Sequence, residues 1–476
     1  MTMIKPILLV TALPFAFAGC TSTNPKSAFD EVDKTVSART GTNVRWARDD
    51  SKRSEIATAV AALLQTNLTA QSAVTIALLN NRSLQAEFEE VGISQADLAQ
   101  AARLKNIELV GSWRFPNRPP SLTDVEYSAA MDFLDLLTLP ARQQIARREL
   151  EQTKLRVADS VLRLAADAQT AFYTVQAGAE LARRLGVILE VNEAAADVAQ
   201  RQYDAGNIND LELRNQLASA GQARLDLMLA QAQTRADRER LNRVLGLSSG
   251  QTNWKVADQL PGLPAMESPL ENLETLAVSQ RLDLAAARSE TESIAAALRL
   301  KQKTRYLPGV TVGVSTERDT DGQRVTGPSL GLEIPLFDQG QPAVARLVAQ
   351  YQQAQNRLAA LEVNVRSEVR QAQDALLATR AATELYAKTL LPQRQKILRE
   401  TLLHYNAMQK SSYELLAAKE REQITERGYV ESLRNYWIAR AELEHAVGGR
   451  LSGEVSPAPA PMQMDSTPAE EHHHNH

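Results

Sequence analysis

Apolar residues recur at alternating steps of four and three along two long, otherwise polar segments of the chain. The positions are Val161, Ala165, Ala168, Phe172, Val175, Ala179 and Ala182 in one segment, and Leu347, Tyr351, Ala354, Leu358, Leu361 and Val365 in the other. A repeat of about 3.5 residues predicts helices that supercoil against neighbouring helices. The second segment, 341–404, predicts a helix about 95 Å long, with a kink at Pro392. The faces opposite the apolar stripes are rich in Arg, Glu and Gln, so we expect them to contact water.

Four shorter segments alternate apolar with small or polar residues, which predicts β-strands. They form two hairpins, 107–115 with 125–137 and 309–318 with 325–337. The second hairpin has one regular apolar side, formed by Val310, Val312, Val314, Leu330, Leu332 and Ile334. The first hairpin alternates less regularly. Four strands are too few to close a barrel and open sheet edges are unstable in lipid, so strands in a membrane would have to come from several chains.

The chain contains the same unit twice. "RQYDAGNINDLELRNQLASAGQARLD" matches "LHYNAMQKSSYELLAAKEREQITERG", which pairs Tyr203 with Tyr405 and Glu212 with Glu414 at a constant offset of 202. Further upstream, "ALLNNRSLQA" (77–86) matches "AVSQRLDLAA" (277–286) at an offset of 200. A duplication of this length predicts a pseudo-symmetric protomer. We expect a signal peptide (1–19), an N-terminal segment (20–67), a first repeat (68–247), a linker (248–269), a second repeat (270–449) and a tail (450–476).

Composition excludes several classes of function. The 476 residues have 5% aromatics and a net charge of −4, without a basic stripe interleaved with aromatics, so nucleic acid is not an expected partner. Beyond the signal, no stretch approaches the roughly 18 to 20 apolar residues of a spanning helix. The chain lacks GxSxG, P-loop, HExxH and CxxC motifs, and only His404 and His445 lie outside the tail. We therefore expect neither an enzyme nor a cofactor.

The N-terminus resembles a bacterial lipoprotein signal. "MTMIKPILLVTALPFAFAGC" has one Lys, an apolar run and small residues before the only cysteine of the chain, Cys20. In such signals the Cys becomes the first mature residue and carries acyl chains that anchor the protein in a membrane. Thr21 follows the Cys, and in the lipoprotein pattern this favours sorting to the outer membrane. The alternative is an ordinary secretory signal with an incidental Cys.

The duplicated unit, "LEIPLFDQG", "ALLNNRSLQAEFEEVGISQADLAQA" and "YDAGNINDLEL" together resemble the outer-membrane efflux proteins typified by TolC. The resemblance covers about 68–449. It implies an α+β membrane protein: a trimer whose protomers each give four strands to one twelve-stranded β-barrel, continued into the periplasm by a long coiled-coil α-barrel. It also implies a passive efflux conduit in the outer membrane, working with a periplasmic adaptor (membrane fusion protein) and an inner-membrane pump of the RND type.

The resemblance places two functional regions at the helix ends. The tip turns that dock an adaptor would lie near Tyr203 and Gly206 in the first repeat and near Tyr405 and Met408 in the second. Met408 stands where the first repeat has Gly206, which leaves open whether both tips dock a partner in the same way. Asp210, Glu212 and Glu414 are candidates for a periplasmic gate, because a ring of acids from three chains would favour cations. The alternative is that these acids only stabilise helix starts through the helix dipole.

The join between the second hairpin and its long helix has a helix-start pattern. Pro335 falls where a strand can tolerate a missing N–H, Asp338 can cap a helix that begins around Gly340, and Pro342 suits its first turn. We interpret this join as the point where a membrane β-barrel becomes a periplasmic α-barrel.

Within the family, "ALLNN" and "PLFDQGQ" resemble the metal-exporting members, and the tail supplies separate evidence on the substrate. "MQMDSTPAEEHHHNH" contains four histidines, and neutral imidazoles with thioethers suit copper and zinc ions. The candidate metal ligands are His472, His473, His474 and His476. The alternatives are an expression tag or an incidental tail, and a channel for small hydrophobic drugs rather than metal ions. The rival to a channel is a lipid-anchored periplasmic coiled-coil scaffold or adaptor whose hairpins are small soluble sheets.

Overall fold

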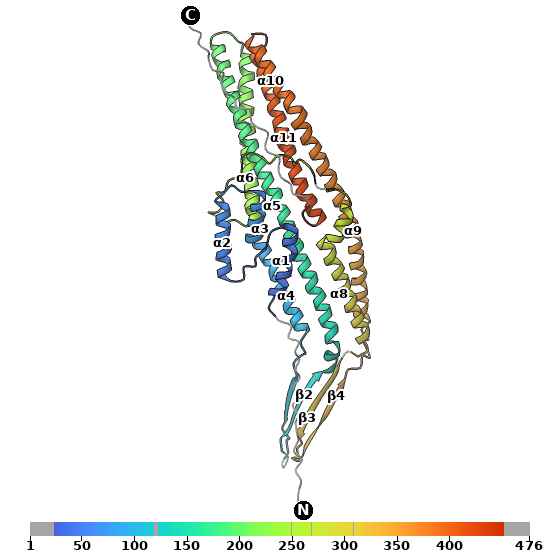
Figure 1. Cartoon of the computed structure of the whole chain (residues 1–476). Helices are drawn as coiled ribbons and strands as arrows, with labels where there is room; N and C mark the ends of the chain where they lie inside the picture. The colour runs from blue at the N-terminus through green and yellow to red at the C-terminus, as the bar shows by residue number, and fades with distance from the viewer. Residues whose placement is uncertain (1–22, 119–121, 249, 268, 308, 452–476) are drawn as a thin grey trace, which may run out of the picture. The chain divides into compact units, whose positions relative to one another are not determined.

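The computed structural model describes residues 23–118, 122–248, 250–267, 269–307 and 309–451. Helices dominate, and four strands form one sheet (Figure 1). Within the described ranges, no helix combines the length and the apolar character that a membrane span requires. Cys20 and the four tail histidines lie outside the described residues.

The elements follow the duplication. Two helices precede the repeats, α1 (Lys26–Thr40) and α2 (Asp50–Leu64). The first repeat contains α3 (Ala70–Asn80), α4 (Arg82–Ala101), β1 (Glu108–Arg114), β2 (Asp124–Asp132), α5 (Phe133–Asp204) and α6 (Asp210–Leu245). The second contains α7 (Leu273–Gln280), α8 (Leu282–Thr304), β3 (Val310–Arg318), β4 (Arg324–Leu332), α9 (Gln341–Leu385), the π-helix η1 (Tyr386–Leu390), α10 (Leu391–Asn406) and α11 (Ser412–Val447). Both repeats therefore place a hairpin between a shorter helix and two long ones.

The sheet is antiparallel throughout, in the order β1-β2-β3-β4. Two strands end earlier than their sequence pattern predicts. The expected strand 125–137 stops at Asp132, because the Asp132 carboxylate accepts the N–H groups of Leu134 (3.0 Å) and Asp135 (3.3 Å) and so starts α5. The expected strand 325–337 stops at Leu332, and the last bond of its ladder runs from the Glu333 N–H to the Gly309 carbonyl.

The helix predicted over 341–404 is interrupted by a π-helical turn. This turn, η1, lies directly before Pro392, which has no N–H to donate and would clash with a regular preceding turn. Tyr386 of η1 packs on Gly428 of α11, where an added Cβ would lie only 2.6 Å from the tyrosine oxygen. At the predicted kink site, the helix changes from α to π at Tyr386, six residues before Pro392, and returns to α at Leu391.

The chain divides into two compact units, which we describe separately. The first (1–32, 88–157 and 285–359) contains the sheet. The second (33–87, 158–284 and 360–476) contains the linker between the repeats and both helix tips. In that unit the described linker residues pack closely on helices: Trp254 and Leu260 are buried, and the Trp437 indole N–H donates to the Pro261 carbonyl at 2.8 Å. Glu267 accepts hydrogen bonds from Arg380, Tyr436 and Arg440, so the linker is part of the core of this unit.

Candidate functional site

One face of the four-stranded sheet is predominantly apolar. Side chains alternate between the two faces of a strand, and the observed register aligns this alternation across all four strands. The apolar residues of this face are Leu109, Trp113, Val125, Tyr127, Ala129, Met131, Val310, Val312, Val314, Pro328, Leu330 and Leu332. Leu109 is 78% exposed and Leu330 is 75% exposed, so the face is not covered within the protomer. The less regular first hairpin thus contributes to the same apolar face as the second.

The opposite face of the sheet is polar and acidic. Its uncharged positions are mainly Ser, Thr, Gly and Ala. Its charged residues are Glu108, Asp124, Glu126, Asp132, Glu317 and Arg114. Five carboxylates against one guanidinium leave a formal excess of four negative charges on this face. A sheet with one apolar and one polar face is the pattern of a barrel that has lipid outside and water inside.

Three carboxylates of the polar face lie around the guanidinium of Arg114. Its guanidinium lies 3.0 Å from the Asp124 carboxylate, 2.7 Å from that of Glu126 and 3.8 Å from that of Glu317. The three acids come from β2 and β3, so the group spans three neighbouring strands. One cation cannot neutralise three carboxylates, and the second oxygen of Asp124 is buried without a hydrogen-bond partner among the described residues. The cluster therefore keeps a net negative charge that attracts cations.

The two helix tips have the same backbone structure. In the first tip, the N–H of Gly206 donates to Tyr203 and that of Asn207 donates to Gln202. The second tip repeats both bonds, from Met408 to Tyr405 and from Gln409 to His404. Gly206 has φ +74° and Met408 has φ +57°, so both occupy the left-handed region that closes a helix end. The glycine-to-methionine difference between the repeats has not changed the turn.

The Met408 side chain makes the second tip chemically distinct. It is 95% exposed, which is unusual for a large apolar side chain. A non-glycine residue in the left-handed region costs about 1–2 kcal/mol. The second tip thus combines a strained backbone with a free thioether, whereas the first tip offers only backbone at this position.

The candidate gate acids stand in the first turns of α6 and α11. The Glu414 side chain accepts the Ser411 N–H at 3.0 Å, and the Ser411 hydroxyl accepts the Glu414 N–H, which is a capping box. Lys410 lies 2.6 Å from Glu414, and this hydrogen bond is the main reason why the pKa of Glu414 is lowered. Glu414 is thus a helix-start acid in this structure, as the alternative interpretation expects; the gate role stays a prediction.

The other two candidate acids have similar local surroundings. Asp210 forms an exposed ion pair with Arg214 at 3.2 Å, one turn further along α6. The N–H of Glu212 is capped by the Asn209 side chain at 2.9 Å. Both acids stand at the start of α6, and the charge of Glu212 also acts on Tyr413 in the first turn of α11. Their gate role stays a prediction.

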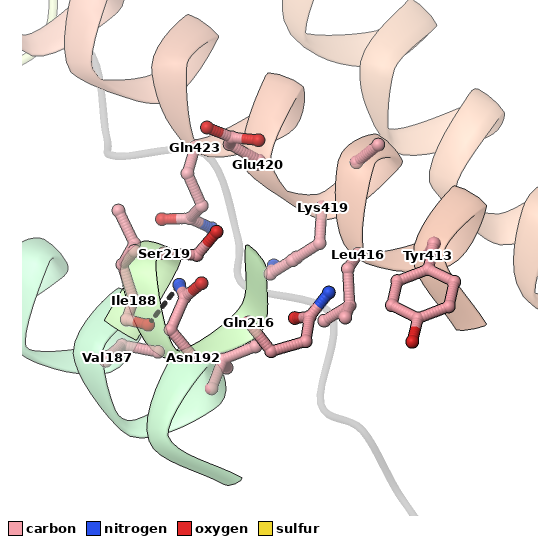
Figure 2. A pocket seen from close by; sticks show the side chains of 12 residues that line it. Val187, Ile188, Asn192, Gln216, Ser219, Tyr413, Leu416, Lys419, Glu420 and Gln423 are labelled. Atoms are coloured by element: carbon pink, nitrogen blue, oxygen red, sulfur yellow. Dashed lines mark hydrogen bonds between the residues drawn. The ribbon is translucent and has the colours of Figure 1, made fainter. Parts of the chain in front are cut away.

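A cavity of about 180 Å³ lies between helices α5, α6 and α11, close in sequence to both tips (Figure 2). Apolar side chains such as Ile188 and Leu416 share its wall with Gln216, Lys419 and Gln423. Gln423 is buried, and its amide lines this cavity. The contact between α11 and the α5–α6 pair is therefore incompletely packed at this point.

The strand-to-helix join differs from its prediction in one detail. Asp338 does not cap the helix; its carboxylate accepts the N–H of Gly340 at 2.8 Å and so braces the turn before α9. Gly340 itself occupies the cap position, with φ +76° and its carbonyl accepting the Val344 N–H. Only glycine fits here easily, because an added Cβ would lie 3.0 Å from the Arg305 Cβ. Pro335 follows the end of β4, as expected for a residue without an N–H.

No group of three His, Cys, Asp or Glu side chains within the described ranges could hold a metal ion. The two sequence-based metal and lipid candidates, the tail histidines and Cys20, fall outside these ranges and stay predictions.

One curated protein and several solved structures are similar to the chain. No family model matches. The chain is 23% identical over 345 residues to the cobalt-zinc-cadmium resistance protein CzcC of Cupriavidus metallidurans, which covers 71% of this chain and 80% of CzcC. The structure matches CusC with a TM-score of 0.67 and 16% identity over 81% of this chain and 93% of CusC. It matches the CmeC outer membrane channel of Campylobacter jejuni with a TM-score of 0.70 and 14% identity over 81% and 87% of the two chains. The chain is thus similar in sequence to CzcC, and its fold is that of CusC and of the CmeC outer membrane channel.

Proposed function

We propose that the chain forms the outer-membrane channel of a tripartite efflux pump and provides a passive exit for cations, metal ions above all. In this proposal the chain is an outer-membrane protein that extends into the periplasm. The conduit itself supplies no energy; an inner-membrane pump of the RND type and a periplasmic adaptor would do so.

The observation that carries the proposal is the two-faced sheet with open edges. β1 and β4 each pair with only one neighbour, so each leaves a row of unpaired backbone groups. Such edges are unstable in lipid and are satisfied when β4 of one chain pairs with β1 of the next. Three chains would then close a barrel of twelve strands with the apolar face toward lipid. A soluble periplasmic scaffold would have no use for this exposed apolar face.

The charge of the polar face supports a cationic substrate. In a closed barrel of three chains this face lines the pore. The pore would then contain three Arg114 clusters, each with excess negative charge. Rings of acidic side chains raise the local concentration of cations and repel anions. The similarity to a protein named for cobalt, zinc and cadmium resistance favours metal ions over hydrophobic drugs. The tail histidines, with their affinity for copper and zinc, would capture such ions.

The helix tips would dock the adaptor. Their identical hydrogen-bond pattern presents the same backbone surface twice per chain, while Met408 marks the second tip for a contact that the first cannot make. Asp210, Glu212 and Glu414 would line the periplasmic mouth near these tips. Acylation of Cys20 would add a lipid anchor.

Ion selectivity in a planar bilayer tests the proposal directly. We expect the purified protein to form pores whose reversal potential in a KCl gradient shows preference for K⁺ over Cl⁻. The triple variant Asp124→Asn, Glu126→Gln and Glu317→Gln should lose most of this preference and keep its conductance. The matched control Glu55→Gln, an exposed acid on α2, should behave as the wild type. A protein that never conducts would refute the channel in favour of the scaffold.

Metal transport requires a second measurement in cells. Deleting the gene should increase sensitivity to zinc, copper or nickel salts, and the wild-type chain should restore resistance. Increased sensitivity to hydrophobic drugs alone would refute the metal substrate while leaving the channel intact.

A further inference from the structure

Two segments next to the sheet form an exposed amphipathic surface, which we call the junction patch. One segment leads from the end of α8 into β3, and the other leads from β4 toward α9. The patch consists of the basic residues Lys301, Lys303 and Arg305 and the apolar residues Tyr306, Leu307, Ile334, Leu336 and Phe337. All five apolar side chains are exposed, and Phe337 has an exposed fraction of 101%. A contiguous group of exposed apolar side chains, unlike a single one, marks an interaction site.

The two segments lie against each other. The Glu333 N–H donates to the Gly309 carbonyl, which holds the start of β3 beside the end of β4. At the other end of the second segment, a Cβ added to Gly340 would lie 3.0 Å from the Arg305 Cβ and 3.7 Å from the Lys301 Cε. The two segments are thus neighbours at both of their ends, and the apolar residues of the second segment lie between Glu333 and Gly340 along the chain.

The apolar part of the patch continues the apolar face of the sheet. Ile334 follows Leu330 and Leu332 at the same two-residue spacing. Beyond Ile334, the Leu336 N–H donates back to the Ile334 carbonyl at 2.9 Å, a tight turn centred on Pro335. This turn leaves Leu336 and Phe337 exposed directly after the last strand residues. The apolar surface therefore extends past the sheet to the level of the helix end.

The basic residues of the patch form no ion pair among the described residues, although the second segment contains the acids Glu333 and Asp338. Among the described residues, neither Lys301 nor Lys303 has a carboxylate within ion-pair distance. The Arg305 guanidinium lies over the Tyr306 ring at 4.3 Å and bonds to its hydroxyl. Lys301 and Lys303 lie in the last turn of α8, where positive charges interact favourably with the helix dipole. This interaction accounts for the two lysines but not for the exposed aromatic and apolar residues beside them.

An apolar band followed by aromatic and basic residues is typical of a membrane–water interface. We propose that the junction patch binds anionic phospholipid headgroups of the inner leaflet of the outer membrane. Leu336 and Phe337 enter the acyl boundary, while Lys301, Lys303 and Arg305 hold lipid phosphates. This inference rests on the proposed function, because it needs the sheet to lie in the membrane. The inference adds a preference for anionic lipids, and binding of these lipids would fix the depth of the barrel in the outer membrane.

Lipid competition on the full-length protein tests the inference. The protein is reconstituted in vesicles of phosphatidylcholine with increasing fractions of phosphatidylglycerol, and spin-labelled versions of both lipids report which one occupies the protein surface. We expect a preference for phosphatidylglycerol that weakens in high salt, because the charges are exposed. Each removed positive charge should lower the preference by roughly fivefold at most.

The variant set separates charge from apolar contact. The triple variant Lys301→Gln, Lys303→Gln and Arg305→Gln should lose the lipid preference, whereas the control triple variant Lys26→Gln, Arg45→Gln and Lys52→Gln should keep it. Phe337→Ser should weaken retention of both lipids. An unchanged preference in the first triple variant would overturn the inference. Loss of the trimer in Phe337→Ser with unchanged lipid binding would assign the phenylalanine to a second copy of the chain instead.

Bilayer conductance distinguishes the two levels of failure. Variants that conduct as the wild type but keep the lipid preference refute only the junction patch. A wild-type protein that binds vesicles but never conducts refutes the channel on which this inference rests.

Discussion

Replacing Met408 with glycine should stabilise the second helix tip. The left-handed conformation at φ +57° costs a non-glycine residue about 1–2 kcal/mol, and glycine removes this cost. Glycine also has more conformational freedom in the unfolded state, which offsets about 0.5–1 kcal/mol of this stabilisation. The Met408 side chain is 95% exposed, so its removal sacrifices little packing. The net stabilisation should therefore be about 0.5–1 kcal/mol.

The first repeat supplies the reverse experiment. Gly206 has the same turn and the same two backbone hydrogen bonds, and a Cβ added there meets no atom within 4 Å. Gly206→Met therefore adds the backbone strain without a steric clash. It should destabilise the first tip by about the amount that Met408→Gly stabilises the second. Met408→Ala keeps a Cβ, and hence the strain, so it serves as the control that should match the wild type.

Amide hydrogen exchange at the tips measures this difference locally. The N–H groups of Gln409 and Asn207, which donate to His404 and Gln202, report the opening of each turn. Met408→Gly should slow exchange at Gln409 by roughly two- to fivefold, and Gly206→Met should speed it at Asn207 by a similar factor. If Met408→Ala slowed exchange as much as Met408→Gly, backbone strain would not be the cause and the reasoning would fail.

Three other substitutions test separate parts of the structure. Arg114→Gln removes the cation from the polar face, so cation selectivity in the bilayer should rise; a fall would mean that this face does not line the pore. The loss of stability should stay below about 1 kcal/mol, because the arginine side chain is 60% exposed. Gly428→Ala places a Cβ 2.6 Å from the Tyr386 oxygen and should lower thermal stability by about 1–3 kcal/mol. Adding Tyr386→Phe should restore part of this loss, and no restoration would locate the strain elsewhere. Burial, and then the nearby Asp283, raise the pKa of Asp159 above its ordinary 3.8. The folded state therefore binds this proton more tightly than the unfolded chain does. The resulting contribution to the free energy of unfolding is present at low pH and is lost as pH rises through the raised pKa. Asp159→Asn should therefore flatten the decline of stability toward neutral pH, as denaturant titrations at several pH values would record.

The repeat, the hairpins and the helix tips were predictable because their signals are local. A period of two or of 3.5 residues, or an offset between matching segments, is visible without knowing the fold. The tip turns needed only the position of Gly206 and its repeat mate. The strand ends were harder, because Asp132 competes for the next two N–H groups and starts a helix where the alternation still suggests a strand.

The two-faced character of the first hairpin required the register. Leu109, Trp113 and Tyr127 form no clean pattern along the sequence, and they share a face only because β1, β2 and β3 pair in one alignment. The Arg114 cluster was missed for the same reason. Asp124 and Glu126 come from β2, whereas Glu317 of β3 lies 191 residues after Glu126 in the sequence (317 − 126 = 191). Both Asp338 and Gly340 could occupy the cap position of α9. Gly340 occupies it, with a positive φ, and Asp338 accepts the Gly340 N–H instead.

The pairing of β2 with β3 joins the two repeats within one sheet. In the proposed trimer, β4 and β1 of adjacent chains make the equivalent contact, so the same hydrogen-bonded seam occurs six times around the barrel and the peptide chain crosses only three of the six. The barrel can thus be regarded as a ring of six related half-molecules. In such a ring, the seams between chains and the seam within each chain would have the same strand-pairing geometry, although the two halves of the chain differ in sequence.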